Sequence, residues 1–204
     1  MAAVAFLALT LPTMVRAETP SAGREALEKL LNAAPEQDHP TPDEEMKLFG
    51  AIYARPPTDN DIIIPWLRRR MDHLQSVFAF ELSRRLFPDD RGAALEWFVI
   101  GETRFVYDLA RCTDSAEGSD VVLATIERSF RPLPEYLWDH PDEHAAALRR
   151  AAARHDLFAP ETSPTCSDAT TPLDEWPSVE ERLRARMVKE AEDLEAKRGA
   201  PPSR

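Results

Sequence analysis

One short string, which runs from His140 to His144, has residue types and spacing that suit metal chemistry. It carries a histidine at each end and Glu143 directly before the second histidine. Residues four apart share one face of a helix, so both imidazoles could hold Zn²⁺. Glu143 would then be placed to act as the general base on a metal-bound water. The string therefore gives one hypothesis, a small zinc-dependent hydrolase in the periplasm.

A structural explanation of the same string competes with this hypothesis. Pro141 is expected at the first helical position, which puts His140 at the cap, and the acidic residues beside it complement the helix dipole. The H-x-x-E-H motif of inverted zinc peptidases also needs a third ligand. Only the glutamates of residues 175–181 follow at modest distance. We favour the structural explanation, expect no cofactor and no catalytic residue, and keep His140 and His144 as the candidate metal ligands.

The two cysteines, Cys112 and Cys166, lie outside any C-x-x-C motif. In an exported chain they would most simply form one disulfide. Closing a loop of about 55 residues would stabilise the fold by roughly 4 kcal/mol in the chain-entropy model. The alternative is two unrelated thiols, one buried and one in a loop.

Residues 1–17 have the pattern of a secretory signal peptide. The run from Ala2 to Leu11 is almost wholly apolar and uncharged, and Val15 and Ala17 supply small residues before a cleavage at Glu18. A membrane span needs about 20 apolar residues, roughly twice the length of this run. No Lys or Arg precedes the run, so a buried N-terminal helix is the alternative. We expect a periplasmic or secreted protein with no membrane span once the signal is removed.

Composition excludes several classes of protein. The chain has 204 residues, of which 36 are acidic and 25 are Lys or Arg, giving a net charge of −11. This acidic balance argues against nucleic-acid binding, despite the arginine run 68–70. Six glycines against 18 prolines, with no G-x-x-x-x-G-K motif, leave no phosphate-binding loop.

The prolines separate segments with helical spacing of apolar residues. Helix starts are indicated at Thr19-Pro20, at Thr41-Pro42 and, through a capping box with Glu181, at Ser178. Further helices are expected over 74–87, 91–112, 119–130 and 142–157. Within 59–70 a helix is expected to start near Asp61 or Pro65, and a short strand of the three isoleucines is the alternative. We predict an all-α fold, a single bundle of six to eight helices. Its parts are a helical domain 18–158, a Pro/Ser/Thr-rich loop 159–177, a C-terminal helix 178–198 and a flexible tail 199–204.

Two of these helices carry candidate site residues. The aromatic-rich helix 91–112 has carboxylates at Glu96 and Glu102, and Arg104 is spaced to pair with Asp108. The C-terminal helix has an apolar stripe, which consists of Val179, Leu183, Met187, Ala191 and Leu194. The stripe either docks on the chain's own core or forms a contact with a partner protein or a second copy. We take Val179, Leu183, Met187 and Leu194 as the candidate interaction residues.

The segment 78–98, FAFELSRRLFPDDRGAALEWF, has small and aromatic residues in a recurring order. Its characteristic positions are Ala79, Leu82, Leu86, Asp90, Ala94, Trp97 and Phe98. In this order it resembles a degenerate Sel1-like repeat, a relative of tetratricopeptide repeats, although the turn lacks the usual glycines. The resemblance implies one antiparallel helical hairpin and a scaffold for protein interactions. We therefore expect a non-enzymatic, exported module that binds another protein or itself.

Overall fold

The computed structural model describes residues 20–33, 42–112, 126, 128–158 and 170–199. The candidate signal peptide, most of the helix expected over 119–130, and Cys166 lie outside the described residues. The described part confirms the all-α prediction with eight α-helices and three short 3-10 helices. The α-helices are α1 (Pro20–Ala33), α2 (Pro42–Tyr53), α3 (Asn60–Arg70), α4 (Ser76–Leu86), α5 (Arg91–Ala110), α7 (Leu133–Asp139), α8 (Pro141–Ala152) and α9 (Trp176–Gly199).

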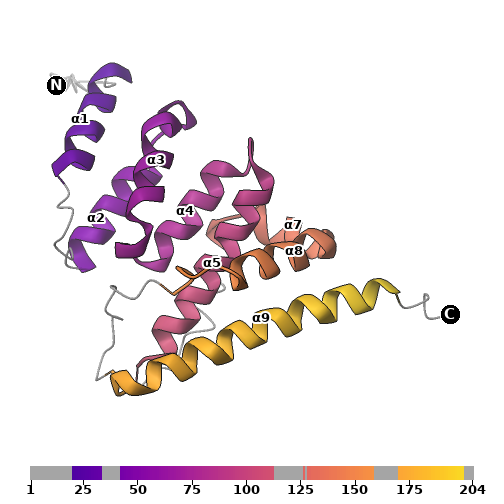
Figure 1. The fold of residues 1–204 in the computed structure, drawn as a ribbon. Helices are drawn as coiled ribbons and strands as arrows, with labels where there is room; N and C mark the ends of the chain where they lie inside the picture. The colour runs from indigo at the N-terminus through magenta and orange to yellow at the C-terminus, as the bar shows by residue number, and fades with distance from the viewer. Residues whose placement is uncertain (1–19, 34–41, 113–125, 127, 159–169, 200–204) are drawn as a thin grey trace, which may run out of the picture.

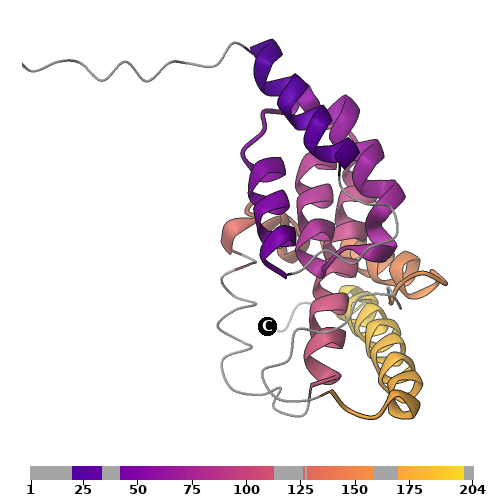
Figure 2. The same ribbon diagram turned by 90° about the vertical axis from the view of Figure 1, so that its left-hand side faces the viewer.

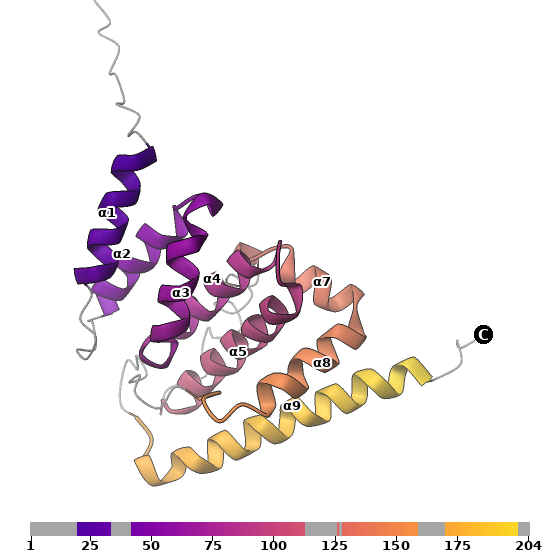
Figure 3. The same cartoon turned by 45° about the horizontal axis from the view of Figure 1, so that its top comes forward.

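Helices α1 to α5 follow one another across the molecule, and α7 and α8 then pack against α5 (Figure 1). Helix α9, the longest of the described helices, lies along α8 and crosses α5 (Figures 1 and 3). The view in Figure 2 shows α1 at the opposite end of the molecule from α9. None of the described helices has the length and hydropathy to cross a membrane.

Helices α4 and α5 form a hairpin that is the centre of the core. Phe78, Phe80 and Phe98 are fully buried there, and the rings of Phe80 and Phe98 meet edge to face at 5.3 Å. The close approach of the two helices depends on Gly101, because a Cβ at this position would lie 3.1 Å from the Phe80 ring. The Ser83 hydroxyl, which is buried, donates a 2.6 Å hydrogen bond to the Ala94 carbonyl.

The isoleucine-rich segment before the arginine run is helical, as expected. Pro65 lies inside α3 and removes one intrahelical hydrogen bond. The burial of Ile63, Trp66 and Leu67 offsets this loss. Trp66 also donates from its indole nitrogen to the Leu31 carbonyl at 3.1 Å, which ties α3 to the end of α1.

The capping box predicted at Ser178 is wrong, because α9 begins two residues earlier. A 3-10 helix over Leu173–Glu175 leads directly into Trp176, and Pro177 occupies the first turn. Ser178 is therefore already inside the helix, and its hydroxyl donates to the Glu175 carbonyl at 2.7 Å. Proline in the first turn costs no helical hydrogen bond, so this earlier start is favourable.

Candidate functional site

A cleft of about 220 Å³ opens between α5, α8 and α9. Each helix supplies residues spaced three or four apart, which therefore share one helical face. The walls are formed by Val99, Glu102, Thr103 and Val106 of α5, His144 and Leu148 of α8, and Leu183, Arg186, Met187 and Glu190 of α9. Four of these residues, Glu102, His144, Leu183 and Met187, are candidates that the sequence singles out for separate reasons.

Small residues bring α8 close enough to α5 to form the cleft. Ala147 and Ala151 of α8 are fully buried, and Ala145 is 2% exposed. Alanine leaves little side chain between two helices, so α8 lies directly against its neighbours. Helix α9 then closes the third side along the same face of α5 and α8.

The floor of the cleft is apolar. Leu148 and Met187 are each 4% exposed and belong to the hydrophobic core. The one hydroxyl at this depth, on Thr103, donates within α5 to the Val99 carbonyl at 2.8 Å and lies 3.5 Å from the Met187 sulfur. The floor therefore presents carbon and sulfur atoms, and methionine adapts its shape readily to an inserted group.

The rim of the cleft is charged. Arg186 and Glu190 lie four apart on α9 and are both exposed, yet neither forms an ion pair with another described residue. His144 is half-buried, and burial lowers its pKa although the Glu190 carboxylate acts in the opposite direction. His144 is therefore neutral at neutral pH. With Glu102 and Glu190 against Arg186, the cleft carries an excess of negative charge.

The structure does not bring the residues of the H-x-x-E-H string together around one point. The His140 ring stacks on Tyr136 with a centroid distance of 3.8 Å, and its Nδ1 lies 2.9 Å from the Tyr136 carbonyl oxygen. Glu143 accepts a 2.7 Å hydrogen bond from the Tyr136 hydroxyl. His144 instead lines the cleft. Over the described ranges, no group of three or more His, Cys, Asp or Glu side chains is arranged to hold a metal ion.

The apolar stripe of α9 docks on the chain's own core. Val179 and Met187 are 5% and 4% exposed, and Leu183 and Leu194 pack against the same cluster. Of the two alternatives for this stripe, the structure shows docking on the chain's own core. The role of Val179, Leu183, Met187 and Leu194 as interaction residues stays a prediction. α5 and α8 present an apolar face that covers the stripe. Polar contacts hold the outer side, among them the ion pair between Arg149 and Glu195 at 2.7 Å.

The ion pair expected between Arg104 and Asp108 is also corrected. Arg104 is 3% exposed and donates to three backbone carbonyls, those of Met71, Asp156 and Leu157, at 2.6–2.8 Å. Burial lowers its pKa to about 10. Asp108 instead accepts a hydrogen bond from Arg111 at 2.5 Å. Arg104 thus joins α5 to the ends of two other segments, a role that spacing along one helix cannot reveal.

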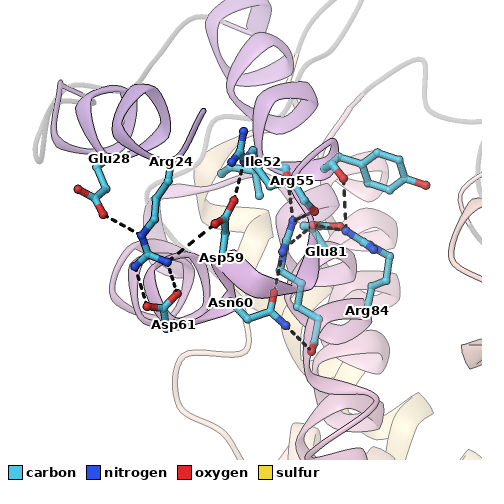
Figure 4. A network of polar contacts seen from close by, with 11 residues as sticks. Arg24, Glu28, Ile52, Arg55, Asp59, Asn60, Asp61, Glu81 and Arg84 are labelled. Atoms are coloured by element: carbon cyan, nitrogen blue, oxygen red, sulfur yellow. Dashed lines mark hydrogen bonds and ion pairs between the residues drawn. The ribbon is translucent and has the colours of Figure 1, made fainter. Parts of the chain in front are cut away.

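A polar cluster around Glu81, Arg84 and Arg85 of α4 has a structural role (Figure 4). Glu81 is fully buried and accepts hydrogen bonds from Arg84 and Arg85 at 2.6–2.7 Å. Arg85 also donates to the Asn60 side chain and to the Ile52 carbonyl at 2.7 and 2.6 Å. Each nitrogen of Arg85 is thus occupied by the protein, so the cluster fixes α2 and α3 on α4 and offers nothing to a ligand.

No protein-family model, no curated protein and no solved structure matches this chain. The Sel1-like character of residues 78–98 stays a prediction.

Proposed function

We propose that this chain is an exported helical module that binds another protein by receiving one of its side chains in the α5–α8–α9 cleft. The observation that carries the proposal is an apolar floor beneath a charged rim. Pockets for whole small molecules commonly measure about 300–1,000 Å³. A cleft of about 220 Å³ is smaller and suits a single side chain better than a cofactor.

The proposal is tested by filling the cleft. Val106 is half-buried in its α5 wall, so Val106→Phe should occupy the space meant for the partner. Val188→Phe, on α9 but outside the cleft, is the matched control. The unchanged chain and each variant would be used as baits in extracts of the compartment to which the chain is exported. The proteins that each bait retains would be identified by mass spectrometry and compared.

A partner retained by the unchanged chain and by Val188→Phe, but lost with Val106→Phe, supports the proposal. A partner retained equally by all three baits contradicts it. Thermal melting shows whether each variant folds. If Val106→Phe does not fold, Glu190→Phe at the exposed rim of the cleft takes its place.

Export is proposed from residues 1–17 alone, which lie outside the described residues. The support is their uncharged apolar run followed by small residues before Glu18. N-terminal sequencing of the chain isolated from cells should begin at Glu18. A chain that retains Met1 would contradict export by this route.

We also propose that Cys112 and Cys166 form a disulfide. Cys112 lies two residues after the end of α5 and makes an isolated antiparallel bridge with Thr170. The Thr171 amide donates to the Arg111 carbonyl at 2.7 Å. These contacts place Thr170 beside Cys112. Cys166 is four residues before Thr170 in the sequence, so the connecting chain is short enough for the two cysteines to meet. Mass analysis without reductant should show a chain lighter by two hydrogen atoms than the reduced chain, and equal masses would refute the pairing.

A further inference from the structure

The α5–α8–α9 cleft combines two recognition elements whose arrangement indicates the chemistry of its occupant. This inference rests on the proposed function, because it names the kind of partner that the same cleft takes. The first element is the apolar floor around Leu148 and Met187. Burial of an aliphatic or aromatic side chain there would be favourable, because apolar surface on both partners leaves water.

The second element is the charge at the rim. Glu190 is exposed on α9 and makes no ion pair with another described residue, so its carboxylate is available to a partner. Glu102 adds a second carboxylate from α5. His144 is kept neutral by burial and does not cancel either charge. Arg186 is the single opposing charge among the cleft residues, and the chain as a whole carries −11.

We infer that the occupant is a segment of a partner protein in which an apolar side chain lies beside a lysine or arginine. The apolar side chain fills the floor, and the cation lies against the rim carboxylate of Glu190. The negative field of the whole chain also favours the approach of a basic segment. An acidic segment that pairs with Arg186 is the competing occupant, and the test below distinguishes the two.

The methionines of the chain provide a direct probe of the cleft. With methyl-¹³C methionine, the signal of Met187 reports on the floor. Met46, which is 53% exposed on α2, reports on non-specific contact, and Met71, which is 2% exposed, reports on general changes of the core. The protein would be titrated with three end-capped peptides of equal length, with central sequences Lys-Leu-Lys, Glu-Leu-Glu and Lys-Ser-Lys.

The Lys-Leu-Lys peptide should shift the Met187 signal in a saturable manner and leave Met46 unchanged. Replacing leucine by serine should weaken binding at least about tenfold, because the floor loses its apolar contact. Replacing the lysines by glutamates should weaken binding about fivefold, the effect of exposed charge pairs on the rim. Added salt should reduce this charge preference.

Two matched variants assign the charge effect to one residue. Glu190→Gln should abolish the preference for Lys-Leu-Lys over Glu-Leu-Glu, whereas Glu192→Gln, on the same helix but outside the cleft, should keep it. Val106→Phe should eliminate the Met187 shift with every peptide.

Three results would overturn the inference. Glu-Leu-Glu binding as tightly as Lys-Leu-Lys would refute the basic partner and leave the proposed function standing. Equal binding of Lys-Ser-Lys, or no shift of Met187 with any peptide, would refute the apolar side chain as the occupant. The proposed function itself fails only if a protein partner is retained when the cleft is filled, so the two failures are distinguishable.

Discussion

Glu45 is a buried carboxyl group whose ionisation should weaken the fold at neutral pH. It lies on α2, is 4% exposed, and forms no ion pair with any described residue. Burial raises its pKa to about 7, against the opposing effect of a hydrogen bond with the Gln75 backbone, and the nearby Asp108 adds a small further increase. The protonated form is thus preferred in the folded state over most of the acidic range.

The magnitude follows from the difference between the folded and unfolded pKa. The unfolded value is 4.5 and the folded value about 7. Each pKa unit corresponds to about 1.4 kcal/mol, so ionisation of Glu45 removes about 3 kcal/mol of stability. Because the folded pKa is the higher one, this stability is fully present below pH 4.5 and is lost as the pH rises to about 7.

Glu45→Gln should therefore stabilise the protein in a pH-dependent manner. Glutamine keeps the shape of the side chain and can accept the same hydrogen bond, but it cannot ionise. Urea unfolding followed by circular dichroism should give a variant that is up to about 3 kcal/mol more stable than the unchanged chain above pH 7. The difference should vanish below the unfolded pKa of 4.5.

Glu44→Gln is the matched control, since Glu44 is the neighbouring residue on α2 and is exposed. It removes an exposed carboxylate from the same helix, so any stabilisation that it shares with Glu45→Gln does not come from burial. The reasoning would be refuted if Glu45→Gln changed the free energy of unfolding by the same amount at every pH. It would also be refuted if the variant were less stable than the unchanged chain above pH 7.

Three other predictions concern the core and the cleft. Glu81→Gln should destabilise the fold by about 3–5 kcal/mol in urea unfolding, because it leaves a buried arginine without its counter-charge; a loss below about 1 kcal/mol would contradict this role. Gly101→Ala should cost about 1–3 kcal/mol through its clash with Phe80, whereas Gly50→Ala, where a Cβ meets open space in α2, should stabilise by roughly 0.5–1 kcal/mol. A stabilising Gly101→Ala would show that α4 and α5 can separate. The pKa of His144, measured by NMR, should lie below its ordinary value of 6.5, because burial disfavours the charged ring. The neutral ring therefore stabilises the fold above pH 6.5, and this stability should be lost as the pH falls. A pKa above 6.5 would show that the Glu190 carboxylate outweighs burial.

The helices could be predicted from the sequence because their signals are local. Prolines and apolar spacing locate α2, α3 and α5 to within a few residues. The start of α9 could not be located, because Ser178 and Glu181 fit a capping box and also fit a helix interior. The true start depends on Trp176 and Pro177, which follow a 3-10 turn without a break.

The cleft could not be predicted, because it depends on contacts between distant segments. Glu102, His144 and Met187 each stand out in the sequence, but nothing along the chain says that they face one another. The same limit explains Arg104, whose partners are backbone carbonyls of segments far from α5. A stripe such as that of α9 has the same pattern whether its own core or another protein covers it.

Because α9 docks along α5 and α8 and forms one wall of the cleft, occupation of the cleft is coupled to the docking of α9. One side of α9 is held by its apolar stripe, so we expect α9 to detach locally while the α4–α5 hairpin stays folded. Detachment removes a wall of the cleft and releases any occupant. An occupant must in turn hold α9 in place by mass action. Amide hydrogen exchange along α9 should therefore slow when the cleft is filled, and exchange in α4 should remain as it was.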